Sequence, residues 1–515
     1  MRRVVVLVAV LAVVGASCST SGGGGGGGGT GPPCTGDIEL PSDGPIAPRV
    51  PPTILDDLPT DLQLETPGFG LDTFDFGPSI LANAPADISA DGTKLLLRTE
   101  DQGAVPGGFF GDVAWIVRDR TTGTNSLVMP ERFAGVWNTA PWVASFLPDG
   151  SVAFTAQGYW LPNDDGGGRE GLPLTQIFRW DIDTHEYTPL SLGPDDKPIG
   201  VVPGQGIAPV SGPENPRVSA DGRHVFFVTK VPLGDEVADP PTPDAGSSFG
   251  GVEDLFRRDT VTGEVVKINV GNHPELGALA NSGASHIIEY EVSADGNFVA
   301  FESPATGGLA EDGYCGWPLI FLRDIAAGTT TLVSHDNHGN QRFGHGVNIS
   351  ADGRYVTYGL SKWNTQYGGA LPGPGMSHLP GVGGVIWDRL TDTTGWALPR
   401  QDGTPSSGPG GMQPDGNLFL RQTRDDGAAA EGIVPGDGDG KWEVLLYDLA
   451  GNTIRKLSQT PDGTNLWPGY DWPTGQAIYP FKLTDDGTRL FFETSRGLLP
   501  EDTDGTGDVY SMAVN

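Results

Sequence analysis

Two short acidic segments near the C-terminus carry carboxylates at a spacing that suits a hard cation. Each places its carboxylates at positions i, i+2 and i+6 with glycine between them: Asp437, Asp439 and Glu443 in the first, and Asp502, Asp504 and Asp508 in the second. Such a segment can wrap one Ca²⁺ ion, with a backbone carbonyl and water completing the oxygen shell. We therefore expect calcium as a structural ion. The alternative is that these Asp-Gly pairs only form turns.

Other residues of types that occur in catalytic or metal sites fit no catalytic pattern. His335, His338 and His345 fall close together, but no HExxH or CxxC motif accompanies them, so we interpret them as solvated loop histidines rather than a zinc site. Residues 246–250 match the GxSxG pattern without the following helix that a nucleophile elbow needs. The sequence therefore predicts no catalytic residue.

Large aromatic residues stand among polar residues in several long connecting segments. The ones we expect to bind a ligand are Trp137, Trp160, Trp363, Trp467, Tyr470 and Trp472. Flat rings beside polar groups suit a sugar or an extended peptide, because rigid rings lose little entropy on binding. The alternative for any one of these rings is packing within the fold.

The N-terminus has the pattern of an export signal. Arg2 and Arg3 precede a short apolar run that ends in Ala-Ser-Cys18, and the run is too short to span a bilayer. This ending resembles the lipobox of bacterial lipoproteins, which implies a lipid on Cys18. Gly15 stands where that box usually has Leu, so secretion after nearby cleavage stays open. We divide the start of the chain into a signal peptide (1–18), a Gly-rich tether (19–36) and an extension (37–59).

Lipidation of Cys18 would leave one pair of cysteines, Cys34 and Cys315, in an oxidising compartment. We expect either a disulfide that pins the N-terminal segment or two unpaired thiols. The formal net charge is -34, so nucleic acid and anionic lipid surfaces would repel the protein. We expect no nucleic-acid partner, contact with a membrane only through the lipid, and a monomer.

A repeated phrase organises the rest of the chain: a Ser/Pro-x-Asp-Gly turn followed by alternating apolar residues. Asp-Gly between two such runs is a strong hairpin signal, because glycine accepts positive φ. The aspartates of these turns are Asp91, Asp149, Asp221, Asp295, Asp352, Asp415 and Asp486.

A second phrase follows every turn but the last: an apolar strand that closes in Arg-Asp, Trp-Asp or a relative, such as Arg323-Asp324, then a short turn. Each unit thus predicts four strands, which is one propeller blade. The sequence predicts an all-β fold, a seven-bladed β-propeller of four-stranded blades over residues 60–515. This pattern resembles the WD40-like, TolB-type β-propeller repeat of bacterial exported proteins, although the chain has more repeats than TolB itself.

The last unit ends after its third strand, at Val509 to Met512. We predict that residues 60–76 supply the missing fourth strand, so that an N-terminal strand closes the ring and no sheet edge is left open. The alternative is an unclosed ring of six blades.

The repeats and the exported N-terminus together favour a cell-surface, lipid-anchored binding scaffold without enzymatic activity, whose ligand is a protein or a glycan. The alternative is an extracytoplasmic enzyme, a polysaccharide lyase or hydrolase, with its active site at the mouth of the propeller channel.

Overall fold

The fold is taken from a computed structural model of the chain. It describes residues 53–55, 58–67, 85–99, 101–106, 114–128, 144–147, 149–157, 175–194, 199, 214–229, 233, 254–272, 287, 289–303, 309, 319–335, 344–360, 383–397, 411–412, 418–424, 442–449, 451–463, 466, 478–484, 487–494, 497–503 and 508–514.

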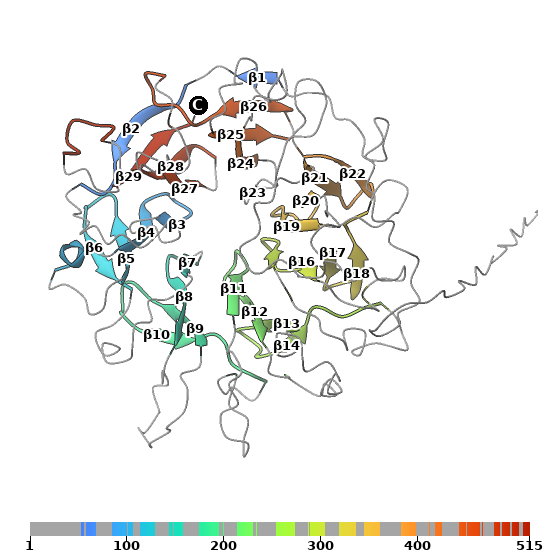
Figure 1. The fold of residues 1–515 in the computed structure, drawn as a ribbon. Coiled ribbons are helices and arrows are strands. Elements are labelled where there is room, and N and C mark those ends of the chain that lie inside the picture. The colour runs from blue at the N-terminus through green and yellow to red at the C-terminus, as the bar shows by residue number, and fades with distance from the viewer. Residues whose placement is uncertain are drawn as a thin grey trace, which may run out of the picture.

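Seven antiparallel sheets stand around a common axis, so the seven-bladed β-propeller is confirmed (Figure 1). Blades one to four contain β3 (Pro85–Ile88), β4 (Lys94–Thr99), β5 (Ala114–Asp119) and β6 (Asn125–Leu127); β7 (Ala144–Phe146), β8 (Val152–Gln157), β9 (Thr175–Trp180) and β10 (Tyr187–Pro189); β11 (Glu214–Val218), β12 (His224–Thr229), β13 (Asp254–Asp259) and β14 (Val265–Lys267); and β15 (Glu289–Val292), β16 (Phe298–Ser303), β17 (Leu319–Asp324) and β18 (Thr329–Leu332).

Blades five to seven contain β19 (Gly344–Ile349), β20 (Tyr355–Leu360), β21 (Gly383–Asp388) and β22 (Thr393–Trp396); β23 (Gly411–Met412), β24 (Leu418–Arg424), β25 (Trp442–Asp448) and β26 (Thr453–Lys456); and β27 (Ile478–Leu483), β28 (Arg489–Thr494) and β29 (Asp508–Ala513). The first strand of each blade lies nearest the axis. The described part of the chain contains one helix, the short 3₁₀ turn η1 (Gln102–Ala104). Among the described residues no helix is long and apolar enough to cross a membrane.

The Ser-x-Asp-Gly phrase forms the turn between the first and second strands of a blade. In blade one the Ser89 hydroxyl donates to Asp91 over 2.7 Å and accepts from the Lys94 amide over 2.9 Å, while Gly92 has a φ of +67°. The hydrogen bond from Ser89 is the main reason why the pKa of Asp91 lies below its usual value. The side chains of the repeat thus close the turn through hydrogen bonds made within it.

In the blades that carry the second phrase, the aspartate at the end of the third strand holds the second hairpin. Asp119 Oδ1 accepts hydrogen bonds from the amides of Thr121 (2.8 Å) and Thr122 (3.0 Å). Asp259 accepts the equivalent bonds and also receives two hydrogen bonds from Arg223, and these keep its pKa well below the usual range. The aspartate of the repeated Arg-Asp signature is therefore explained by hairpin geometry.

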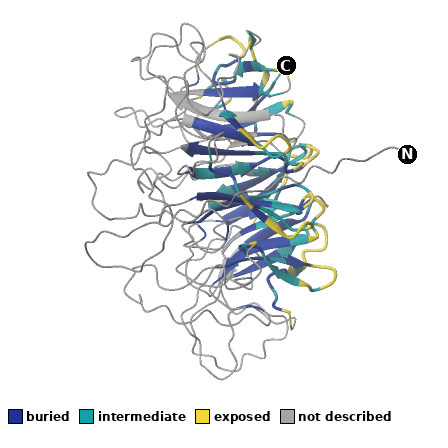
Figure 2. Ribbon diagram, turned by 90° about the vertical axis from the view of Figure 1, so that its right-hand side faces the viewer, coloured by how far each residue is buried: buried dark blue, intermediate teal, exposed yellow. Residues whose placement is uncertain are grey.

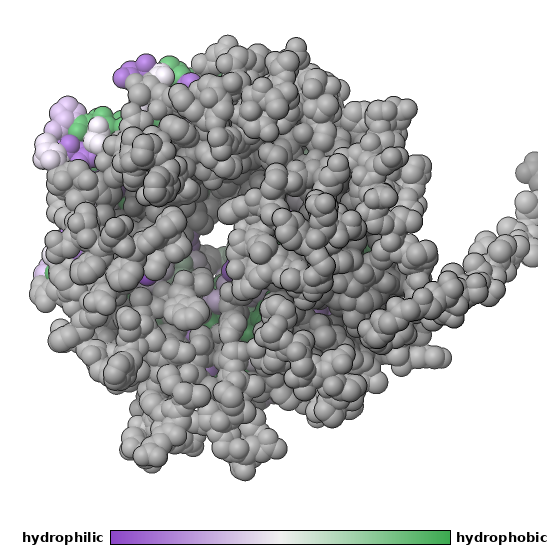
Figure 3. Space-filling model, viewed as in Figure 1, coloured by the Kyte–Doolittle hydropathy of each residue, from purple (hydrophilic) through white to green (hydrophobic). Residues whose placement is uncertain are grey.

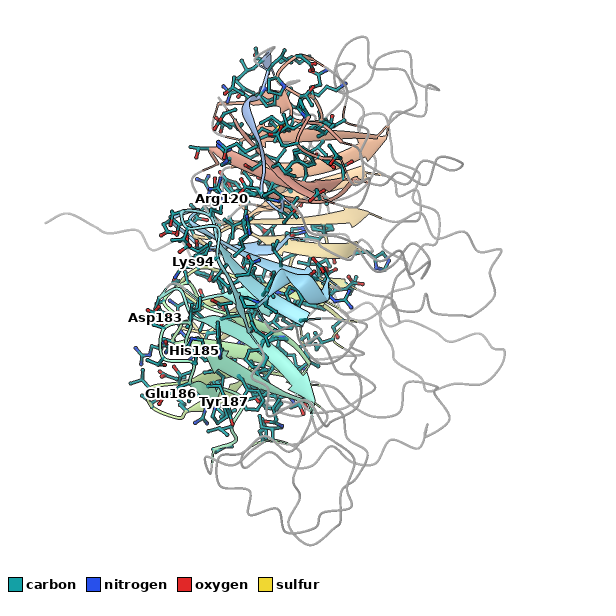
Figure 4. The ribbon with its side chains drawn as sticks, turned by 90° about the vertical axis from the view of Figure 1, so that its left-hand side faces the viewer. Lys94, Arg120, Asp183, His185, Glu186 and Tyr187 are labelled. Carbon is teal, nitrogen blue, oxygen red and sulfur yellow. The ribbon has the colours of Figure 1, made fainter. Side chains whose placement is uncertain are left out.

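Because neighbouring strands are antiparallel, both kinds of turn leave each blade at the same edge. We call this edge of the ring the turn face and the opposite edge the loop face. Exposed residues of the described chain gather at the turn face (Figure 2). Lys94 and Arg120 of blade one and the hairpin residues Asp183, His185 and Glu186 of blade two all lie on this side (Figure 4).

The core lies between blades rather than inside them. Alternate residues of β16 belong to different clusters: Val299 and Phe301 pack with Phe226 of blade three, whereas Ala300 packs with Val347 and Val356 of blade five. The period of two along a strand therefore lets one strand bury both of its faces against neighbours. Because both faces of such a strand are buried, its sequence is apolar at nearly every position.

The ring is closed by β2 (Thr60–Leu64), which pairs antiparallel with β29 as the outermost strand of blade seven. Thr66 continues the closure: its hydroxyl donates to Asp508 over 2.7 Å and accepts from the Val509 amide over 2.9 Å. The predicted N-terminal closing strand is thus confirmed over residues 60–64, and residues 68–76 lie outside the described ranges.

A second N-terminal strand was not predicted. β1 (Thr53–Leu55) pairs in parallel with β26 and adds a fifth strand to blade six. The sequence carries no signal for this strand, because three residues are too few to show an alternating pattern and no hairpin turn joins β1 to β26. The segment expected to be an extension therefore contributes to the sheet of one blade before the chain reaches the next.

Candidate functional site

Charged side chains from three neighbouring blades come together along the inner strands of the ring. β11, β15 and β19 are the first strands of blades three, four and five, and each begins at the loop face. We call the cluster of Arg217, Glu289, Glu291, Glu302 and His345 the channel mouth. Glu289, Glu302 and His345 lie at the loop-side ends of their strands, whereas Arg217 and Glu291 lie one residue from the turn-side ends of theirs. The space-filling view shows an opening at the centre of the ring (Figure 3).

Two glutamates face each other directly in blade four. Glu289, the first residue of β15, is the register partner of Glu302, close to the end of β16. Partners in an antiparallel pair project to the same face of the sheet, with Cβ atoms about 5 Å apart. Two ionised carboxylates at that separation repel each other, so one of them needs a compensating cation or a proton.

The Glu302 carboxylate is compensated by blade five. Its side chain is 2% exposed, and Oε1 lies 2.7 Å from His345 Nδ1 while Oε2 accepts the Gly346 amide at 3.2 Å. Gly346 has a φ of +70° and sits where the pairing of β19 with β20 changes register. A bulge that requires glycine thus turns a backbone N–H and an imidazole toward one buried carboxylate.

The Glu291 carboxylate is compensated by blade three. Arg217 donates from Nε to Oε2 over 3.0 Å and from a terminal nitrogen to Oε1 over 2.7 Å, and its guanidinium lies over the Tyr290 ring. Burial alone would lower the pKa of Arg217, but the Glu291 carboxylate outweighs it and raises that pKa. The same burial raises the pKa of the Tyr290 hydroxyl, so both groups keep their protons.

Glu289 is the one of the three carboxylates that neither neighbouring blade compensates. Among the described residues it receives no hydrogen bond and forms no ion pair, while Arg217 and His345 are engaged by Glu291 and Glu302. Burial, followed by repulsion from Glu302 and Glu291, raises the pKa of Glu289 to about 7. The channel mouth therefore holds a group that can bind or release a proton near neutral pH.

His335 and His345 are not solvated loop residues, so that interpretation was wrong for both. His345 belongs to β19, and His335 Nε2 lies 3.2 Å from Asp392 with 12% of the His335 side chain exposed. His338 lies outside the described residues.

The predicted metal ligands are only partly described. Asp437, Asp439 and Asp504 fall outside the described ranges, as does the side chain of Glu443 in β25. Within the described part of the chain no group of three such side chains is placed to hold a metal ion. The calcium expectation stays a prediction.

Asp502 and Asp508, the two described members of the second segment, are held differently. Asp508 is buried and accepts from Thr66, whereas Asp502 Oδ2 accepts from the Tyr510 hydroxyl. Burial and, after it, the hydrogen bond to Asp502 raise the pKa of Tyr510. Asp502 Oδ1 is buried without a hydrogen-bond partner in the described structure. One carboxylate oxygen of the predicted calcium segment is thus free to coordinate.

The predicted ligand-binding aromatics lie outside the described residues: Trp137, Trp160, Trp363, Trp467, Tyr470 and Trp472. The same is true of Cys18, Cys34 and Cys315. The aromatic binding face, the lipid site and the disulfide therefore stay predictions.

A cavity of about 360 Å³ lies at the closing seam of the ring, lined among others by Gln63, Glu65, Asp91 and Arg118. Arg120 crosses this seam: it donates to both oxygens of Glu65 (2.9 and 2.8 Å) and to the Gly92 carbonyl (2.7 Å). The polar groups here hold blade seven against blade one, which gives the seam a structural role.

The channel mouth was missed because its residues come from three separate repeats. One signal was available. Arg217 and Glu291 both stand two residues before the serine of a Ser-Ala-Asp-Gly turn, in neighbouring repeats and with opposite charges. The glutamate pair needed the register of β15 against β16, which the repeat alone does not fix.

Comparison with known proteins leaves the family open. No protein-family model and no curated protein matches the chain. Among solved structures, an oligogalacturonate lyase from Vibrio parahaemolyticus is 11% identical with a TM-score of 0.47, over 89% of this chain and 98% of that one. An oligogalacturonate lyase in complex with manganese is 14% identical with a TM-score of 0.44, over 84% and 90%. TolB from Acinetobacter baumannii is 13% identical with a TM-score of 0.32, over 72% and 62%. At these values none of the three is a basis for assigning a site or a ligand.

Proposed function

We propose that the protein is a cell-surface, lipid-anchored β-propeller that binds a protein or a glycan, without enzymatic activity, at the channel mouth. The observation that carries this proposal is the uncompensated Glu289 between two satisfied charge pairs, Arg217 with Glu291 and His345 with Glu302. A half-buried carboxyl without a hydrogen-bond partner is costly in the free protein. A ligand that supplies the missing partner recovers that cost on binding.

The experiment is co-purification from the native envelope with tagged wild-type protein and tagged Glu289→Gln. The matched control is Glu264→Gln, because Glu264 is an exposed glutamate in the β13–β14 hairpin on the opposite face. A partner captured by wild type and by the control, and lost with Glu289→Gln, supports the proposal. Equal recovery with all three proteins would place the ligand elsewhere.

The second candidate is an extracytoplasmic enzyme, a polysaccharide lyase or hydrolase, with its active site at the same mouth. The observation that favours it is the Glu289 carboxyl, with a pKa of about 7, whose register partner Glu302 contacts the His345 imidazole, since general acid–base catalysis works best with groups that titrate near neutral pH. Incubation with a panel of neutral and acidic oligosaccharides between pH 5 and 9 tests it. New unsaturated or reducing ends that vanish with Glu289→Gln would favour the enzyme over the scaffold.

The anchor proposal rests on Cys18 and the glycine run that follows it. A diacylglycerol on Cys18 would hold the ring at the membrane, with residues 19–36 as a flexible spacer. Labelled palmitate should enter the wild-type protein and be absent from Cys18→Ala. Label that persists in that variant would move the anchor elsewhere or exclude it.

A structural calcium ion is proposed for the segment of Asp502, Asp504 and Asp508, and by analogy for Asp437, Asp439 and Glu443. The buried, unpartnered Asp502 Oδ1 supports the first of these. Chelation should lower the thermal midpoint of the wild type and leave that of Asp502→Asn unchanged. An identical midpoint with and without chelator would exclude a stabilising ion. The Cys34–Cys315 disulfide is a further proposal, which mass spectrometry of the unreduced protein can test.

A further inference from the structure

The charges at the channel mouth do not balance. Three carboxylates, those of Glu289, Glu291 and Glu302, lie near two hydrogen-bonding partners, the Arg217 guanidinium and the His345 imidazole. Geometry assigns each partner to one carboxylate: Arg217 grips Glu291 with two hydrogen bonds, and His345 lies 2.7 Å from the buried oxygen of Glu302. The third carboxylate, Glu289, has no cation of its own.

We propose that the channel mouth binds a positively charged amine or guanidinium side chain of a polypeptide ligand, with Glu289 as its ion-pair partner, and that binding expels a proton from Glu289. This inference rests on the proposed function and names the chemistry that the same site would recognise. With the incoming cation, each of the three carboxylates of blade four has a partner of its own.

Electrostatics favours a cation over other ligands. An anionic group would add a fourth negative charge beside the glutamate pair, and the whole chain, at -34, would repel it at longer range. A neutral hydroxyl could donate a hydrogen bond but would leave the charge of Glu289 uncompensated. A basic side chain is attracted at long range, which speeds association, and it compensates the charge of Glu289 at contact, which makes binding specific for cations.

The groups that act on Glu289 come from every element around it. Glu302 on β16 and Glu291 on its own strand disfavour the ionised form, whereas Arg217 on β11 and His345 on β19 favour it. Burial adds to the first effect and is the largest single cause. In the absence of a further cation, Glu289 therefore keeps its proton up to a pH of about 7.

The sign of the pH dependence follows. An ion pair needs the ionised carboxylate, so a cationic ligand must displace the proton wherever Glu289 still carries it. With a pKa of about 7, affinity should rise about tenfold between pH 6 and pH 8, and up to one proton should be released per ligand at the lower pH. A ligand that instead hydrogen-bonds to the protonated carboxyl would show the opposite dependence.

The test is calorimetry with acetylated tetralysine amide, whose side chains stay charged over this range. Titrations at pH 6 and 8, in two buffers of different ionisation enthalpy and at fixed salt, give affinity and proton release together. The Nε-acetylated peptide is the neutral probe. The protein variants are Glu289→Gln and the control Glu264→Gln, with infrared spectra of the free proteins to follow the protonated carboxyl band between pH 6 and 8.

We expect tight binding of the charged probe only, a tenfold gain in affinity with pH, and proton release, all lost in Glu289→Gln and kept in Glu264→Gln. Loss of the protonated carboxyl band in Glu289→Gln alone would support the assignment without any ligand. Absent binding, affinity independent of pH, or equal behaviour of the two variants would overturn the inference. The proposed function is judged separately, by co-purification with native partners, so the two can fail independently.

Discussion

Arg120 of blade one grips Glu65, the residue that follows the closing strand, with hydrogen bonds of 2.9 and 2.8 Å to its two carboxylate oxygens. Only 7% of the Glu65 side chain is exposed, and Ser511 of β29 donates to the same carboxylate. The ion pair therefore joins three parts of the molecule: the N-terminal strand, blade seven and blade one. Removal of either partner leaves a poorly solvated charge at the seam.

We expect Glu65→Ala to lower the free energy of unfolding by about 3 kcal/mol, because it strands the Arg120 guanidinium. The measurement is urea denaturation at neutral pH. The control is Arg179→Ala, which removes the exposed pair with Asp149 and should change stability by less than about 1 kcal/mol. Similar effects of the two variants would argue against a special role of the seam.

The closing strand itself can be removed in steps. A chain starting at residue 60 loses β1 but keeps β2, and we expect a modest decrease in thermal stability, because only three residues pair with β26. A chain starting at residue 67 also loses β2, Glu65 and Thr66, and it leaves blade seven with an open edge. We expect that shorter chain to unfold at a much lower temperature or to aggregate. Equal midpoints for the two chains would mean that β2 does not close the ring.

Two glycines with nearly the same φ make a matched pair. A Cβ on Gly353 (φ +67°) would lie 2.3 Å from Phe298 Cδ2, whereas a Cβ on Gly328 (φ +70°) would have no atom within 4 Å. Gly328→Ala should cost about 1 kcal/mol for the backbone conformation alone. Gly353→Ala should cost at least about 2 kcal/mol more, because Phe298 is fixed beneath Arg389 at 4.2 Å. Equal unfolding free energies would show that Phe298 yields freely.

Glu289 should make stability depend on pH. It binds its proton more tightly in the folded chain, with a pKa of about 7, than at the ordinary value of 4.5 expected after unfolding. Its stabilising contribution is therefore complete below about pH 4.5 and is lost as pH rises through 7. Since glutamine imitates the protonated form, Glu289→Gln should match wild type at pH 5 and exceed it by about 1 kcal/mol at pH 8. Denaturation curves at both pH values test this, and a constant difference would contradict it.

A double-mutant cycle can measure the interaction free energy between His345 and Glu302. Among the described residues, His345→Ala leaves the buried Glu302 carboxylate with one hydrogen bond, from the Gly346 amide. The variant should lower the free energy of unfolding by about 2 to 3 kcal/mol at neutral pH. Glu302→Gln on that background should recover part of the loss, because it removes the stranded charge. Additive losses in unfolding free energy would show that the two side chains act independently.

The fold was predictable because the same turn chemistry recurs along the described chain. Ser219 and Asp221 make the same hydrogen bond as Ser89 and Asp91, so a local pattern that folds locally could be counted along the chain. The closing strand was predictable from the missing fourth strand of the last unit. β1 was not, because its pairing with β26 depends only on proximity.

The channel mouth lay beyond such reasoning for a physical reason. His345 meets Glu302 only because β19 bulges at Gly346, and Glu289 meets Glu302 only in the observed register. A shift of one residue would send these side chains to opposite faces of the sheet. Periodicity counts the repeats, but the contacts between neighbouring repeats depend on these irregularities.

Closure by β2 also sets an order of events in biosynthesis. Thr66 and Asp508, which hydrogen-bond at the seam, are separated by 442 residues, so the N-terminal strand leaves the ribosome long before its partner exists. During that interval β2 presents an unpaired edge to other nascent chains. Newly made copies at high local density should therefore be prone to exchange this strand with one another, and slow synthesis should increase the yield of such strand-exchanged dimers.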